Sequence, residues 1–330
     1  MDKQAIPLAN RKAVNGKKRR DWIFCLCIAI PILAQWLIFY VYSRINSVLS
    51  SFQYFNAAHA LDPTQPMYLF LPKEDIFRWY KMYFQDLTQD PEIAKYLFNG
   101  FWFWLLSYLV GIFSIFIAFA MHKKFPGHKL MVAVMIIPGA LSGLVNTLMM
   151  KYFIERCIPA LAFEFGAVDL SKFQLLLSRK ETALGACLAM TTYMAIPGSL
   201  LFYLGQFNRI PEELVEYAHM EGIGFFGEFW HLAFPTIYPV WSMGNWGILV
   251  AWLNATGPGY ALYGLDGYNR GVMTFRYHLQ ITILGGKDGL YPEHWYPYTA
   301  TVGVVDSMLS LMSIAIMKRI FDKLDPNKEY

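Results

Sequence analysis

The segment "EYAHMEGIGFFGEFWHLAFP", which runs from Glu216 to Pro235, is a polar interruption between two strongly apolar stretches of the chain. It contains three acids, two histidines, three glycines and a row of aromatic residues. Gly222 and Gly224 interrupt a helical pattern, because glycine adopts backbone conformations that other residues resist. We therefore predict two short helices joined by a turn around Gly222.

The lead-in to this segment has the features of a helix start. Pro211 suits the first helical position, where its missing N–H costs nothing, and two glutamates follow at the positive end of the helix dipole. Leu214, Tyr217 and Ala218 fall on one face. Such helices can lie in a membrane interface, pack on their own bundle or dock into a groove of a partner protein, and the pattern leaves all three open.

The composition favours a membrane protein. Of 330 residues, 56% are hydrophobic and 16% are charged, against about 25% charged in ordinary soluble domains. Aromatic residues reach 17%, and Trp and Tyr concentrate at membrane–water boundaries. The net charge of +4 and the lack of a recognition motif exclude nucleic acid as an expected partner. Membrane lipid is expected to surround the chain.

Six stretches are long and apolar enough to cross a bilayer, which takes about 20 residues. The sequence therefore predicts an all-α membrane protein of about six transmembrane helices, with the Glu216–Pro235 segment between the fourth and fifth. A basic leader precedes the first stretch, but its apolar core is too long for a signal peptide, so we expect an uncleaved anchor. The expected spans are Trp22–Tyr42, Leu97–Met121, Leu130–Met150, Ala183–Gln206, Leu232–Thr256 and Tyr298–Met317.

Lys and Arg are about twice as dense in the segments that lie inside if the N-terminus is cytoplasmic. Both termini and the polar segment are then expected in the cytoplasm. Helical spacing in "KEDIFRWYKMYFQDL" predicts short helices in the long outer loop. The expected organisation is a basic tail (1–21), a first span (22–43), an extracytoplasmic loop (44–96), a core of five helices (97–320) with the cytoplasmic segment 207–232, and a C-terminal tail (321–330).

The sequence contains no arrangement of residues that indicates an enzyme. It lacks the phosphate-binding loop, so ATP used by this protein would be bound by another chain. Its four cysteines lack zinc-site spacing, and no metal ligands or catalytic residues are expected.

The spacing of the polar segment resembles the E-A-A-x3-G-x9-I-x-L-P signature of permease subunits of binding-protein-dependent ABC importers. Here the signature reads Glu216-Tyr217-Ala218, three residues, Gly222, nine residues and "LAFP" ending at Pro235. The preceding "IPEELVEYA" is similar to the carbohydrate-uptake branch, in which Glu221 often has Asp as its counterpart. Tyr217 departs from the pattern, since it replaces the first alanine.

This resemblance implies a mechanism and a set of partners. The cytoplasmic helix would couple the membrane bundle to a separate ATPase, which would bind ATP and Mg, while this chain would bind no cofactor. The partners implied are an ATPase dimer, a second and distinct permease subunit, and an extracytoplasmic solute-binding protein that delivers a carbohydrate. The coupling residues implied are Glu216, Tyr217, Ala218, Glu221, Gly222 and Pro235.

Polar and aromatic residues in the fifth and sixth spans are candidates for a sugar path, although helix–helix packing or interfacial anchoring is the simpler role for them. Asp306 is the one acid in the sixth span, so a proton-coupled secondary transporter is the alternative function. A membrane enzyme is a third class, and no catalytic group supports it. The candidates for the path are Trp246, Trp252, Asn254, Asn245 and Asp306.

Overall fold

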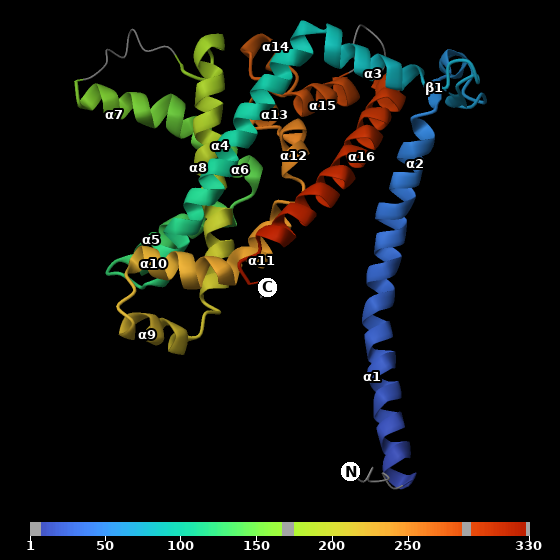
Figure 1. Cartoon of the computed structure of the whole chain (residues 1–330). Helices are drawn as coiled ribbons and strands as arrows, with labels where there is room; N and C mark the ends of the chain where they lie inside the picture. The colour runs from blue at the N-terminus through green and yellow to red at the C-terminus, as the bar shows by residue number, and fades with distance from the viewer. Residues whose placement is uncertain (1–7, 167–174, 286–291, 328–330) are drawn as a thin grey trace.

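The computed structural model describes residues 8–166, 175–285 and 292–327, and this part of the chain is almost entirely helical (Figure 1). Its one sheet has two short antiparallel strands. The prediction of an all-α membrane protein is therefore confirmed.

Four helices are long and apolar enough to cross a membrane within the described residues. The first includes Trp22–Ser50 and forms one continuous rod of three consecutive elements, and the others extend the predicted second, fourth and sixth spans at both ends. These elements are α1 (Leu8–Gln35), η1 (Trp36–Val41), α2 (Tyr42–Ser50), α4 (Pro91–His122), α8 (Lys180–Phe207) and α16 (Pro292–Leu324).

The predicted third span, Leu130–Met150, is not one helix. It divides into α5 (His128–Ala140) and α6 (Gly143–Tyr152), and the chain bends by 109° between them. Leu141 and Ser142 are extended at this break, and the Ser142 side chain accepts a hydrogen bond from the first turn of α6. Pro138 lies one turn before the bend, where a proline loosens a helix. Two elements continue from α6: η3 (Phe153–Cys157) and α7 (Ile158–Glu164).

The predicted fifth span, Leu232–Thr256, is also wrong as a single helix. Helical structure is continuous from Phe225 to Gly244 and breaks at Asn245–Gly247, where glycines stand on both sides. In Figure 1 the first part crosses the lower ends of the long helices rather than running along them. The prediction of about six spans is thus corrected to four in the described residues, or five with the bent pair. The pieces are α10 (Phe225–Glu228), η4 (Phe229–Ala233), α11 (Phe234–Gly244), α12 (Ile248–Ala251) and η5 (Trp252–Asn254).

A small cap covers the end of the bundle that is remote from the polar segment. Its predicted helix is present as α3 (Arg78–Gln89), and a hairpin that the sequence did not reveal precedes it. Within the cap, the Trp79 Nε1–H donates to the Gln53 carbonyl at 2.7 Å. The Tyr298 hydroxyl donates to Asp86 at 2.6 Å, and this bond ties the cap to α16. The hairpin elements are β1 (Gln53–Phe55), η2 (Ala57–Ala60) and β2 (Tyr68–Phe70).

The bundle has two separate buried cores. The core below the cap joins α3, α4, α8 and α16 with two of the three short helices that follow η5, α13 and α15, and it includes Tyr83, Phe103, Met190 and Tyr277. The core at the opposite end joins α4 and α8 to η4 and α11. The short helices are α13 (Gly259–Tyr263), α14 (Gly267–Arg270) and α15 (Phe275–Gly285).

The first span contrasts with the rest of the bundle. None of the residues in its most apolar window is buried, and only α2 and the adjoining strand contact the remainder of the described chain closely. Figure 1 shows α1 standing apart from the other helices. Its apolar side chains must therefore meet lipid or another protein.

Gly257 provides a test of the upper core. Its φ is +59°, and a Cβ at this position would lie 2.8 Å from the buried ring of Phe103. Gly257→Ala should destabilise the protein by more than the about 1–2 kcal/mol expected from left-handed strain alone, because the added methyl also overpacks the core. Thermal unfolding of the detergent-solubilised protein measures this effect.

Gly127→Ala is the matched control, since Gly127 has a φ of +91° and open space around its Cβ position. Equal melting temperatures for the two variants would contradict the close packing of Gly257 against Phe103.

Candidate functional site

The polar segment folds as two helices around a tight turn, as predicted. Helix α9 (Glu212–Met220) ends where Gly222 adopts a φ of +70°. The Ile223 N–H donates to the Ala218 carbonyl at 3.0 Å and the Gly222 N–H to the His219 carbonyl at 3.1 Å, the bond pair of a Schellman cap. Gly224 then precedes α10. Pro211 is extended and lies just before α9 rather than at its first helical position, which corrects the expected start.

Helix α9 presents most of its surface to the outside. Ala218 is buried and Val215 packs against the lower core, whereas Leu214 and Tyr217 are 45% and 64% exposed. The expected apolar face of Leu214, Tyr217 and Ala218 is therefore wrong, because only Ala218 points inward. At helical spacing, the side opposite the buried one carries four exposed residues, which we call the outer face of α9: Glu213, Glu216, Tyr217 and Met220.

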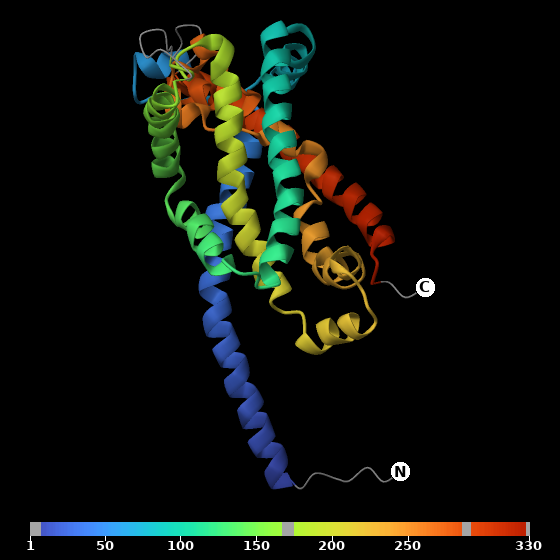
Figure 2. The same ribbon diagram turned by 90° about the vertical axis from the view of Figure 1, so that its left-hand side faces the viewer.

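The lower core holds the second half of the segment against the bundle. Phe229, Ala233 and Ile237 are fully or almost fully buried among side chains of α4 and α8. The Phe229 ring stacks on Phe116 of α4 with centroids 4.4 Å apart. Figure 2 shows α9 beyond this core, at the end of the bundle opposite the cap.

A buried ion pair fixes the segment to the end of α4. The Glu228 side chain is 3% exposed, and its carboxylate pairs with the ammonium of Lys123, the residue that follows α4. His219 of α9 places its Nε2 3.7 Å from the other carboxylate oxygen. Glu228 thus connects three elements. Sequence reasoning missed its role, although an acid within an aromatic run was the available signal.

The remaining predicted coupling residues have ordinary environments. Glu221 is exposed and ends α9, and Glu216 is exposed on the outer face. Pro235 is half-buried near the start of α11, and its carbonyl accepts a hydrogen bond of 2.8 Å from Asn327 in the C-terminal tail.

Two of the predicted path residues lie together. The Asn254 Nδ2 donates to an Asp306 carboxylate oxygen at 2.9 Å, which joins the end of η5 to the middle of α16. The other oxygen of Asp306 is buried and has no hydrogen-bond partner among the described residues.

The other three candidates point elsewhere. Asn245 bonds the Trp241 carbonyl at 2.7 Å and so caps α11, and the Trp252 ring nitrogen bonds the Leu249 carbonyl at 3.1 Å beside apolar side chains of α4. Trp246 lies at the lower half of α16, where the Lys318 ammonium sits 5.4 Å from its ring centre. The five residues are thus not one site. Among the described residues, no cluster of His, Cys, Asp and Glu could hold a metal ion.

The known proteins that resemble this chain belong to sugar-transport and ABC-transport systems. No family profile matches the chain. The multiple sugar-binding transport system permease protein MsmF of Streptococcus mutans is 30% identical over 164 residues, or 48% of this chain and 55% of that protein. The match therefore spans about half the length of this relative.

Solved structures extend the likeness to nearly the whole chain at the level of fold. A chain of a bacterial alginate ABC transporter, crystallised with its pentasaccharide-bound periplasmic protein, superposes with a TM-score of 0.65 at 14% identity. The superposition covers 95% of this chain and 99% of that one. A second structure of a bacterial alginate importer gives a TM-score of 0.61 at 15% identity, covering 96% and 100%. The resemblance to carbohydrate ABC permeases and the multi-pass membrane fold are thus confirmed.

The ion pair at Glu228 can be tested through stability. Lys123→Met removes the cation and leaves a buried carboxylate, which typically costs about 3–5 kcal/mol. The double variant Lys123→Met/Glu228→Leu removes both charges and should recover most of the lost stability. Thermal unfolding in detergent compares the two proteins. A double variant no more stable than the single one would contradict the pairing.

Proposed function

We propose that the chain is the transmembrane permease subunit of an ATP-driven importer, and that α9 couples it to a separate ATPase. The observation that carries this proposal is the construction of the α9–α10 segment. An exposed helix with a largely outward-facing surface is fastened to the bundle by a buried ion pair and an aromatic core. A helix that only covered its own bundle would bury more of its surface.

The outer face of α9 has the chemistry of a docking surface. Tyr217 and Met220 are 64% and 74% exposed, and two carboxylates flank them. Apolar anchors surrounded by charged groups are typical of a helix that enters a groove on a partner. The partner is an ATPase dimer that binds ATP and Mg, while this chain binds neither.

The fastening explains how movement of the ATPase would reach the membrane. Lys123 follows α4, and Glu228 belongs to the helix that continues into α11. When α9 is displaced, α4, α8 and α11 then move with it as one rigid body. This movement switches the opening of the bundle from one side of the membrane to the other. Chemistry on ATP stays on the partner chain.

The solute is a carbohydrate, by analogy with the sugar-transport permease MsmF. An extracytoplasmic binding protein delivers it, as the complex with a sugar-loaded periplasmic protein indicates for the alginate transporter. The exposed apolar surface of the first span packs against a second, distinct permease subunit in this proposal. In this arrangement α9 and both termini are cytoplasmic, in a prokaryotic plasma membrane, and the cap is outside.

A proton-coupled secondary transporter is the second candidate function. The observation that favours it is an acid within the long apolar helix α16, Asp306, one of whose oxygens is buried and has no hydrogen-bond partner among the described residues. Such a transporter needs no docking helix. Dependence on the proton gradient therefore separates the two functions.

Gly222→Pro tests the proposed coupling directly. Proline fixes φ near −65° and lacks the N–H that Gly222 donates, so the turn at +70° cannot form. In vesicles that contain the complete transporter, this variant should lose most solute-stimulated ATP hydrolysis and uptake while still inserting into the membrane.

Gly224→Ala is the matched control, since Gly224 has an ordinary φ of −74° and open space at its Cβ position. It should keep nearly full activity. Normal uptake by Gly222→Pro, or wild-type uptake that follows the proton gradient and ignores ATP, would overturn the proposal.

Glu216→Lys tests the docking face. Reversing one exposed charge beside a docking surface changes electrostatic complementarity and should weaken co-purification with the ATPase several-fold at low salt. Glu164→Lys, an exposed charge reversal on α7, is the control and should leave association unchanged. Equal association of all three proteins would count against the role of the outer face.

A further inference from the structure

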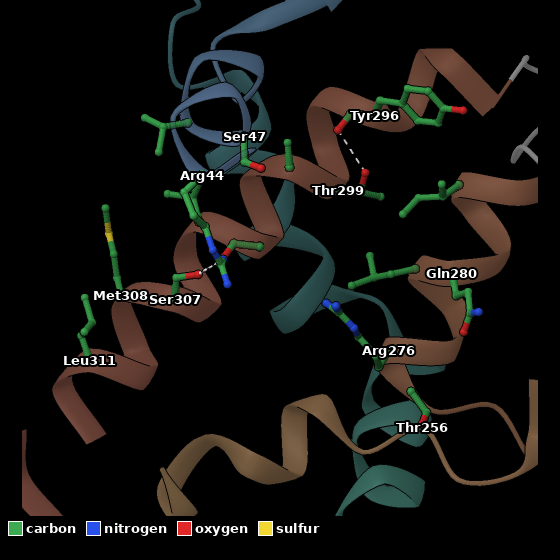
Figure 3. A pocket seen from close by; sticks show the side chains of 16 residues that line it. Arg44, Ser47, Thr256, Arg276, Gln280, Tyr296, Thr299, Ser307, Met308 and Leu311 are labelled. Atoms are coloured by element: carbon green, nitrogen blue, oxygen red, sulfur yellow. Dashed lines mark hydrogen bonds between the residues drawn. The ribbon is translucent and has the colours of Figure 1, made fainter. Parts of the chain in front are cut away.

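A second feature lies on the cap side of the bundle, away from α9. A cavity of about 830 Å³ opens between α2, α15 and α16, and its size is in the range of small-molecule sites. Figure 3 shows side chains from the three helices converging on it. The Asn254–Asp306 pair is close in sequence to its wall, because Thr256 and Ser307 both line the cavity.

Two arginines face this cavity from opposite sides. Arg44 of α2 donates a hydrogen bond of 2.8 Å to the Ser307 hydroxyl, and Arg276 extends from α15 (Figure 3). Arg276 makes no hydrogen bond or ion pair with any described residue, and both guanidinium groups belong to exposed residues. The cavity therefore carries two positively charged groups, which favour an anionic ligand.

The described residues that line the cavity include no Asp or Glu. The Asn254 amide donates to one Asp306 carboxylate oxygen, and no ion pair among the described residues joins Asp306 to an arginine. The amide of Gln280 and the hydroxyl of Thr256 have no hydrogen-bond partner among the described residues. Both groups are therefore available to bind the hydroxyls of a ligand.

Apolar side chains form much of the remaining wall, and they include Leu279, Val304 and Met308. A sugar ring presents C–H surfaces as well as hydroxyls, so a mixed wall of this kind suits a saccharide. Arginine binds carboxylates through two parallel N–H bonds, which lysine cannot do.

We infer that this cavity binds a carboxylate-bearing saccharide, such as a uronic-acid oligosaccharide, with Arg44 and Arg276 holding the carboxylate groups. The inference rests on the proposed function, because it names the class of solute for that permease. The cavity then selects acidic over neutral sugars on the outer side of the bundle.

Binding to the full chain in nanodiscs of neutral phosphatidylcholine tests this inference. Trigalacturonate should bind the wild-type protein, whereas maltotriose, a neutral trisaccharide, should bind at least about tenfold more weakly. Arg276→Gln should weaken trigalacturonate binding about ten- to hundredfold, as expected for the loss of a charge-assisted contact. Since Arg276 forms no hydrogen bond or ion pair with another described residue, this variant should fold normally. Arg44→Gln is the second variant. Thermal unfolding curves of both variants report whether they fold.

Lys95→Gln is the matched control, because Lys95 is exposed on α4 and pairs only with Glu92 at the surface. It should bind trigalacturonate like the wild type. Equal binding of the two trisaccharides, or unchanged binding by a folded Arg276→Gln, would overturn the inference. Loss of trigalacturonate binding in phosphatidylglycerol nanodiscs would also overturn it, by assigning the arginines to a lipid headgroup.

The proposed function fails separately. If trigalacturonate still binds but no ATP-driven uptake occurs, the proposed importer function is contradicted and the proposed binding site is not. If ATP drives the uptake of neutral sugars and neither arginine substitution affects it, the proposed binding site is contradicted and the proposed importer function is not.

Discussion

The buried ion pair between Lys123 and Glu228 is the interaction on which the proposed coupling depends. A carboxylate that is 3% exposed is stable only with a partner, so the two residues hold the end of α4 and the start of the α10–α11 helix in one place. The lower core supplies most of the burial there, and the ion pair fixes how the parts align. The ion pair therefore acts together with the buried Ala218 and the packed Val215 in holding α9 to the bundle.

Much of this region could be predicted from the sequence because its signals are local. Gly222 marks a left-handed turn, and the hydropathy of α4, α8 and α16 identifies spans without knowledge of their neighbours. The prediction of which residues of α9 face inward was wrong, because the orientation of a short helix depends on the elements that it packs against. Likewise, nothing local reveals that Glu228 meets Lys123, which is 105 residues away.

The third and fifth predicted spans were wrong because an apolar stretch long enough to cross a membrane need not form one straight helix. Residues 232–256 are apolar enough to cross a membrane, yet the helix breaks at Asn245–Gly247 and the chain turns there. This break leaves η5 opposite α16, where Asn254 reaches Asp306. Of the candidate path residues only this pair came together, since in-span aromatic residues serve packing as readily as recognition.

The most direct measurement of the central claim is a distance between spin labels on α9 and α4. Labels at Glu212 of α9 and Phe113 of α4, both exposed, would be placed in a variant with the native cysteines replaced by serine, assembled into a transporter that hydrolyses ATP. The account predicts the same distance distribution with and without bound ATP, because α9 and α4 move as one body. A distribution that shifts or broadens when ATP binds would contradict it.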